Sequence, residues 1–171
     1  MRRMMLQFSG AIALALCACG SAAQTSPIVA GSALAHPQNA RGGMVATQEA
    51  TATSIGVDIL RRGGNAVDAA VAIGFALAVT LPRAGNLGGG GFMLVHHART
   101  NRTVAIDYRE MAPALASRDM YLDADSNVDK RRARYTHLSV GVPGTVSGLL
   151  TALERFGTMS RAAVMAPAIA L

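Results

Sequence analysis

Residues 65–82 read NAVDAAVAIGFALAVTLP, an apolar run of helix length that ends at a proline. Asn65 is a favourable N-cap residue, and Asp68 three positions later can complete a capping box. Pro82 cannot continue the helix, because its nitrogen has no hydrogen to donate and its ring clashes with the preceding turn. Since apolar residues occur on nearly every side of this segment, the pattern predicts a buried helix.

A second helix is predicted just before it, in the segment QEATATSIGVDILRRGG at residues 48–64. We expect Thr47 to be its N-cap, because a side-chain oxygen at that position can accept a free amide of the first turn. One helical face carries the apolar residues Ile55, Ile59 and Leu60. Gly63-Gly64 supply a left-handed stop. Residues 44–46 (MVA) read as a short buried strand ahead of the helix.

A β-hairpin is predicted further along the chain. Four glycines at 88–91 lead into FMLVHH at residues 92–97, and a turn separates this run from TVAIDYRE at residues 103–110. Two short runs of this kind on either side of a polar turn are typical of antiparallel strands.

The remaining segments are a charged loop and two helices. Residues 123–134 (DADSNVDKRRAR) read as a solvated surface loop. Residues 142–145 (VPGT) open a helix that runs through Leu153 and stops at Gly157, and residues 162–171 begin another. The order of helix pair, hairpin and helices predicts an α/β or α+β fold.

Composition limits the classes of protein that fit. The chain has 171 residues, 51% of them hydrophobic, which favours one domain or part of one and excludes a disordered charged tail. The formal charge is +6, from 16 basic and 10 acidic residues. Setting aside Arg2 and Arg3, which belong to a targeting segment, leaves a balance of +4, too small an excess to predict nucleic acid as a partner.

The amino terminus reads as an export signal. Residues 1–23 combine a basic start, a short apolar run and small residues before a predicted cut at Gln24. The alternative is lipidation of Cys19, because residues 16–20 (LCACG) are close to a bacterial lipobox. Residues 24–41 read as an extended leader, and the folded part is expected at residues 42–171. Both cysteines lie in the signal, so the exported body has no cysteine chemistry.

Three other motifs carry weaker signals. The glycine run fails as a nucleotide-binding loop, because such a loop needs a strand before it and a helix after it; a tight turn at a close backbone approach fits better. His96-His97 lie on opposite strand faces and cannot bind one metal in simple geometry. Thr136-His137 invites a nucleophile reading, but an exposed loop pair is the better interpretation. No metal or cofactor is predicted.

Arg109 is the candidate anion-binding residue. In the predicted second strand Val104 and Ile106 share one face, while Asp107 and Arg109 share the other, which leaves the guanidinium at a strand end and free to enter a cleft. A guanidinium can hold a carboxylate through two parallel hydrogen bonds. Because Asp107 and Glu110 flank Arg109, a surface salt bridge accounts for this residue equally well.

Four motifs together resemble the amino-terminal part of bacterial γ-glutamyltranspeptidases, also called glutathione hydrolases. In order along the chain they are GGNAVDAAVA (63–72), GNLGGGGF (85–92), DYREMAP (107–113) and GVPGTV (141–146). No single motif would suffice, but their order and spacing are highly specific. The resemblance covers residues 42–171.

The resemblance implies part of the αββα sandwich of the N-terminal nucleophile hydrolases, incomplete in this chain. Such proteins are made as one precursor that cuts itself into a large and a small subunit. The new amino-terminal Thr of the small subunit attacks the γ-glutamyl amide, and water or an amine releases the acyl enzyme. The family's Arg that binds the α-carboxylate of the glutamyl group corresponds to Arg109. The implied location is periplasmic or secreted, or the outer membrane if Cys19 is lipidated.

The implied partners are glutathione and other γ-glutamyl compounds, amino acid or peptide acceptors, and the missing carboxy-terminal part that forms the small subunit. The Thr-Thr-His segment that starts the small subunit has no counterpart here, and Thr136-His137 is not assigned that role. We therefore expect the front fragment of a larger protein, without a catalytic centre of its own. A β-lactam side-chain acylase of the same fold and an inactive exported remnant are the alternatives.

Overall fold

The computed structural model describes residues 39–171, and Ala40–Leu171 form one compact unit. The predicted signal peptide at residues 1–23, Cys19 and nearly all of the leader at residues 24–41 lie outside the described residues. No helix within residues 39–171 is both long and apolar enough to cross a membrane.

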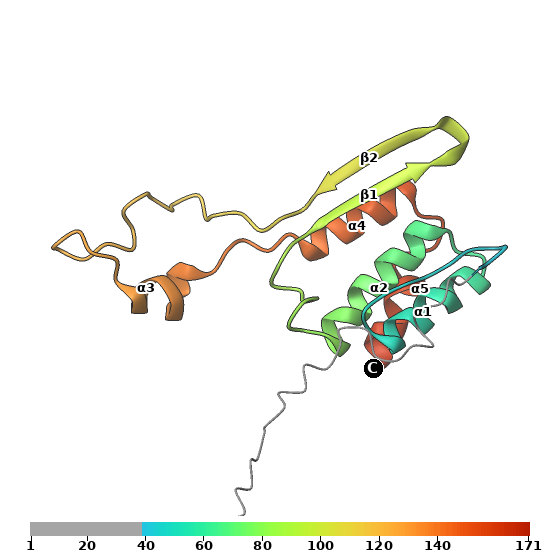
Figure 1. Cartoon of the computed structure of the whole chain (residues 1–171), viewed down its shortest axis with the longest axis horizontal. Helices are drawn as coiled ribbons and strands as arrows, with labels where there is room; N and C mark the ends of the chain where they lie inside the picture. Colours follow the sequence, from blue (N-terminus) through green and yellow to red (C-terminus); the bar gives the residue numbers. More distant parts are fainter. Residues whose placement is uncertain (1–38) are drawn as a thin grey trace, which may run out of the picture. The chain divides into compact units, whose positions relative to one another are not determined.

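Five α-helices and one two-stranded sheet make up the described part of the chain (Figure 1). Their bounds are α1 Ala50–Arg61, α2 Ala66–Thr80, β1 Phe92–His97, β2 Arg102–Asp107, α3 Lys130–Tyr135, α4 Thr145–Phe156 and α5 Arg161–Ala170. The short 3-10 turns are η2 Ala98–Thr100 and η3 His137–Ser139. The predicted mixture of helices and strands is confirmed.

Helix α2 is the centre of the core, and it packs against α1, α4 and α5. Its buried apolar residues are Val67, Ala69, Val71, Ala72, Phe75 and Ala76. The prediction of a buried helix is therefore confirmed for its first three turns. It is wrong for the last turn, where Val79 is 49% exposed.

The buried carboxylate of Asp68 joins the start of α2 to the turn between α4 and α5. The predicted capping box is present, with Asp68 Oδ2 accepting the amide of Asn65 at 2.7 Å. Asp68 also accepts the Thr158 amide at 2.9 Å, the Thr158 hydroxyl at 2.6 Å and the Met159 amide at 3.0 Å. Burial by itself would raise the pKa of Asp68, but these hydrogen bonds together lower it below its ordinary value of 3.8.

The predicted hairpin is confirmed, with Phe92 paired to Asp107 and His97 paired to Arg102 in an antiparallel register. Its inward face carries Met93, Val95, Val104 and Ile106, all packed on the hydrophobic core. Strand β2 contacts α4, which runs along the hairpin (Figure 1). The hairpin therefore covers the helical layer with one face and leaves Leu94 on the other face 76% exposed.

The helices after the hairpin form close to their predicted positions. Helix α4 ends at Phe156, where Gly157 is the C-cap, and Ser160 caps α5 by accepting the amide of Ala163. Gly63 has a left-handed φ of +89° and stops α1 as predicted.

Two predictions near the first helix are wrong. Residues 44–46 form no strand, because both strands of the described sheet pair with each other and none lies beside this segment. The N-cap of α1 is Glu49 rather than Thr47, since the longer carboxylate accepts the amides of Thr51 and Ala52. These hydrogen bonds lower the pKa of Glu49. Thr47 instead accepts the amide of Glu49 at 3.1 Å.

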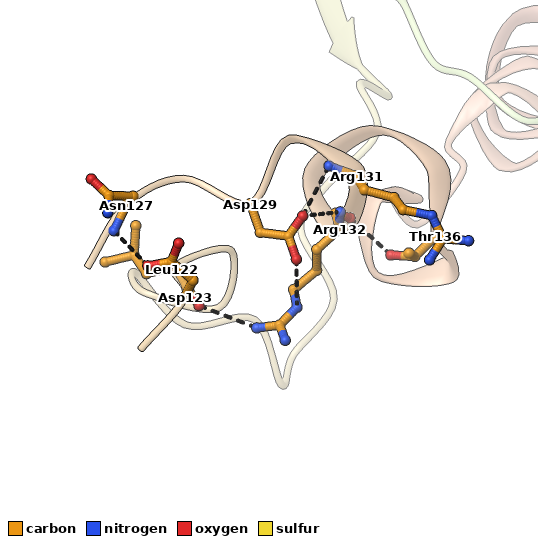
Figure 2. A network of polar contacts seen from close by, with 7 residues as sticks. All are labelled: Leu122, Asp123, Asn127, Asp129, Arg131, Arg132 and Thr136. Carbon is orange, nitrogen blue, oxygen red and sulfur yellow. Dashed lines mark hydrogen bonds and ion pairs between the residues drawn. The ribbon is translucent and has the colours of Figure 1, made fainter. Parts of the chain in front are cut away.

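The predicted surface loop at residues 123–134 contains the start of helix α3. Asp129 caps it by accepting the amides of Arg131 and Arg132, as Figure 2 shows. The Arg132 side chain also donates to the carbonyl oxygen of Leu122 at 3.2 Å. An aspartate just before a run of good helix formers is enough to start one short helix on the surface.

Replacing Asp68 tests the joint between α2 and the α4–α5 turn. We expect Asp68→Asn to lower the free energy of unfolding by about 3 kcal/mol. The new NH2 group replaces a carboxylate oxygen and would face amide or hydroxyl donors that Asp68 now accepts, which leaves buried donors unpaired. Urea unfolding measures the change. The matched control is Asp58→Asn, which removes an exposed pair with Arg62 at 3.6 Å and should cost no more than about 0.5 kcal/mol. Equal costs for the two variants would contradict the assignment.

The lowered pKa of Asp68 also predicts a pH dependence. Because the folded state holds the deprotonated form, the contribution of Asp68 is complete above about pH 5. It is lost as the pH falls through the ordinary value of 3.8 and on through the lower pKa of the folded state. The stability difference between the native protein and Asp68→Asn should therefore shrink as the pH is lowered from 6 to 3. A difference that stays constant over this range would rule out the proposed charge state.

Candidate functional site

Arg109 lies two residues beyond the end of β2, where the hairpin gives way to an extended segment. Its backbone amide donates to Oδ1 of Asp107 at 3.0 Å. Its guanidinium Nε lies 3.6 Å from Oε1 of Glu110, and its side chain is 64% exposed. The salt-bridge interpretation is therefore correct, but the pair is long and exposed, so it leaves most of the guanidinium donors available.

Two chain segments converge on the backbone around Arg109. The first is the glycine run, where the Tyr108 amide donates to the Gly91 carbonyl at 3.0 Å. The second begins at Val142, whose amide donates to the Met111 carbonyl at 2.8 Å. The glycine run and the start of α4 also meet directly, because the Gly89 carbonyl accepts the amides of Gly144 and Thr145. The residues on either side of Arg109 are thus fixed by backbone hydrogen bonds.

Two cavities open beside Arg109. One, of about 280 Å³, lies between the end of β2 and the start of α4, with Ser147 and Thr151 in its wall. The other, of about 440 Å³, lies along the segment that follows, beside Tyr121 and Ser139. Arg109 lines both, as expected for a residue at a strand end. A cavity of about 500 Å³ near the start of α2 is larger, but Arg109 is not among the residues that line it.

The side chain of Tyr108, the residue before Arg109, packs against helix α4. Its ring packs so closely on α4 that a Cβ added to Gly148 would overlap Cγ of the ring. Burial raises the pKa of the Tyr108 hydroxyl, so this side chain stays neutral at physiological pH. Tyr108 therefore faces the core, while the next residue, Arg109, faces outward.

The other candidate motifs do not form sites. The Thr136 hydroxyl donates to the Arg132 carbonyl at 2.8 Å, and His137 is exposed in the following turn, so the two do not make a nucleophile and base. His96 and His97 bond through Nδ1 to the hydroxyls of Thr103 and Thr100. Within residues 39–171, no three side chains of the metal-binding types lie close enough together to hold an ion.

Two features of the site go beyond the predictions. Asp107 is predicted only as a neighbouring charge, although an aspartate two residues before the amide it accepts is a common turn signal. The close approach of Gly144 and Gly148 to Tyr108 is not predicted, because nothing in the local sequence indicates which distant segment will lie against them. The predicted close approach at the glycine run is confirmed, since Gly90 lies against the backbone of residues 108–110.

Known proteins of one family are similar to this chain in sequence. The sequence profile of the gamma-glutamyltranspeptidase family matches residues 52–171. Glutathione hydrolase proenzyme of Escherichia coli K12 is 58% identical over 136 residues, which are 80% of this chain and 23% of that protein. This chain therefore spans about a quarter of the length of that relative.

Solved structures share the fold of the described residues. The crystal structure of Helicobacter pylori gamma-glutamyltranspeptidase superposes with a TM-score of 0.74 and 45% identity, covering 78% of this chain and 38% of that one. Cephalosporin acylase from Bacillus halodurans superposes with a TM-score of 0.60 and 28% identity, covering 79% of this chain and 26% of that one. The described residues are thus a mixed helix and strand part of the fold that these enzymes share. With the family profile matching well over half of its residues, the chain belongs to the gamma-glutamyltranspeptidase family.

Proposed function

We propose that this chain is the amino-terminal part of a glutathione hydrolase that also acts as a γ-glutamyltransferase. The proposal is supported by 58% identity to a glutathione hydrolase proenzyme, over a stretch that makes up 23% of that protein. The nucleophilic Thr and the oxyanion donors would come from the missing carboxy-terminal part.

In the complete enzyme, the Thr hydroxyl oxygen attacks the γ-carbonyl carbon of glutathione, and the amide nitrogen leaves as the amine of cysteinylglycine after taking up a proton. The resulting γ-glutamyl ester is then cleaved by water, which releases glutamate, or by the amine of an acceptor. No metal or cofactor is needed for either half. The contribution of this chain is to bind the substrate rather than to make or break a bond.

The observation that carries the proposal is the exposed position of the Arg109 guanidinium beside two cavities. Three carbon atoms separate the α-carboxylate of the substrate from its reacting carbonyl. The enzyme therefore needs a cation for this carboxylate at some distance from the nucleophile. Arg109 offers a guanidinium that is 64% exposed, borders two cavities and, among residues 39–171, has as its one ion pair a 3.6 Å contact to Glu110. A substrate carboxylate can replace that contact with two short parallel hydrogen bonds.

A β-lactam side-chain acylase is the second candidate, supported by the TM-score of 0.60 to cephalosporin acylase. Its identity to this chain is 28%, well below the 45% to Helicobacter pylori gamma-glutamyltranspeptidase. A glutaryl group has a carboxylate but no α-amine, so γ-glutamyl and glutaryl anilides distinguish the two activities. An inactive remnant is the third candidate, and a precursor of full length in cells would exclude it.

We also propose that the enzyme is exported, with residues 1–23 as its signal peptide. The basic start and the short apolar run of these residues support this location. Export would place the enzyme in the periplasm or outside the cell, where it meets glutathione that has left the cytoplasm.

Removing the Arg109 guanidinium tests the substrate-binding role in the complete enzyme. Arg109→Ala should raise the KM for γ-glutamyl p-nitroanilide about a hundredfold, because two charge-assisted hydrogen bonds are lost. Arg109→Lys should raise it about tenfold, since it keeps the charge but not the planar fork. Steady-state kinetics per mole of self-cleaved enzyme measures both.

The matched control is Arg118→Ala, because Arg118 is also an exposed arginine paired with the acidic residue that follows it, at 2.9 Å. It should leave the KM unchanged. The 4-aminobutyryl anilide, which has no α-carboxylate, should be cleaved equally well by the native enzyme and Arg109→Ala. An unchanged KM for the γ-glutamyl substrate in Arg109→Ala would sink the assignment.

The fate of the amino terminus is tested separately. If the signal peptide is simply cleaved, the native protein and a Cys19→Ser variant should both begin at Gln24 and appear in the soluble periplasmic or secreted fraction. Mass spectrometry of the mature protein measures this. A diacylglycerol on Cys19, together with membrane retention that Cys19→Ser abolishes, would instead establish the lipoprotein alternative.

A further inference from the structure

Two glycines that belong to different segments lie against the backbone of residues 108–110. Gly90 faces it from the glycine run, and Gly144 faces it from the start of α4. A Cβ added to Gly90 would lie 2.6 Å from the Tyr108 carbonyl oxygen and 2.7 Å from the carbonyl carbon of Arg109. A Cβ added to Gly144 would overlap the Tyr108 carbonyl group. The space at both glycines is therefore too small for any side chain.

Both positions are glycine because of this space and not because of their backbone conformation. Among the described residues, the glycines with left-handed φ are Gly43 and Gly63, so neither Gly90 nor Gly144 needs glycine for its torsion angles. Gly88, in the same run as Gly90, has only Asn86 Oδ1 near its added Cβ, at 3.8 Å. The close contact is thus a property of Gly90 and not of the run as a whole.

Asp107 also restrains this backbone. Its Oδ1 accepts the Arg109 amide at 3.0 Å, in a turn that sets how the chain leaves β2. Asp107 is itself exposed, so this contact does not belong to the hydrophobic core. The start of the Arg109 side chain is thereby fixed, although its outer end is free.

We infer that Gly90, Gly144 and Asp107 are positioning residues for substrate binding, which set the reach and direction of the Arg109 guanidinium. The inference rests on the proposed function and adds residues that touch neither the substrate nor the reacting atoms. A long arginine side chain has many rotamers, so its guanidinium can occupy many positions. Fixing the backbone from which the side chain starts reduces the number of these positions. Bidentate carboxylate binding requires the fork to be aligned, so a shift of about 1 Å at the backbone is expected to weaken it strongly.

The test uses the complete enzyme and two substrates, γ-glutamyl p-nitroanilide and 4-aminobutyryl p-nitroanilide, which differ only in the α-carboxylate. The measured quantity is the ratio of kcat/KM for the first to kcat/KM for the second, per mole of self-cleaved enzyme. General damage to the fold lowers both values and leaves the ratio unchanged. Misplacement of Arg109 lowers the ratio.

Gly90→Ala should lower this ratio about tenfold, mainly through the KM for the γ-glutamyl substrate. The matched control is Gly88→Ala, which adds the same methyl group two residues earlier, where there is room for it. Gly88→Ala should keep the native ratio. A native ratio in Gly90→Ala would overturn the role of the glycine contact.

Asp107 supplies a second pair of variants that does not insert atoms into a packed region. Asp107→Ala removes the acceptor for the Arg109 amide and should lower the ratio several-fold. Asp107→Asn keeps an acceptor oxygen at the same place and should restore most of the ratio. Since both variants lose the charge, the difference between them reports the hydrogen bond. Equal ratios in these two variants would overturn the role of Asp107, and this pair decides the inference if Gly90→Ala yields no mature enzyme.

Arg109→Ala separates failure of this inference from failure of the proposed function. If Arg109→Ala lowers the ratio while Gly90→Ala and Asp107→Ala do not, Arg109 binds the carboxylate without help from these residues, and the inference is wrong. If Arg109→Ala itself leaves the ratio unchanged, the proposed role of Arg109 is wrong and the inference falls with it.

Discussion

A buried carboxylate, that of Asp68, is the constraint on which the arrangement of the helices depends. It accepts four hydrogen bonds, one from the start of its own helix and three from residues 158 and 159. A buried charge without such partners would destabilise the fold by several kcal/mol, so the α4–α5 turn has to lie at the start of α2. Asn65 strengthens the same joint by donating its side-chain amide to the Phe156 carbonyl at 2.7 Å.

The position of Arg109 follows from that joint through a short series of contacts. With α4 fixed against α2, its N-cap Gly144 and its first turn, at Gly148, leave room for another segment of the chain to approach closely. Strand β2 packs there, with Ile106 and the ring of Tyr108 directed into the core. The next residue of an extended chain has to face outward, and that residue is Arg109. An exposed guanidinium on a backbone held this firmly suits the recognition of a carboxylate.

Several parts of the fold could be predicted from the sequence because their causes are local. Asn65 and Asp68 form a capping box within four residues, Gly63 and Gly157 end helices that their neighbours begin, and alternation predicts which hairpin residues face inward. The failed predictions have equally physical reasons. The apolar segment at residues 44–46 has no strand beside it in the described part of the chain, and Glu49 is a longer acceptor than Thr47 that reaches the free amides first.

The sequence by itself determined the order of the helix pair, the hairpin and the two helices at its end, membership of the gamma-glutamyltranspeptidase family and the choice of Arg109 as the candidate anion-binding residue. Capping, periodicity and motif spacing are properties of neighbouring residues, so they can be read along the chain. Only the tertiary structure decided that Asp68 holds residues 158 and 159, and that Gly90 and Gly144 lie against the backbone around Arg109. These contacts join segments distant along the chain, and which segments meet depends on how the whole core packs, a property that no local pattern contains.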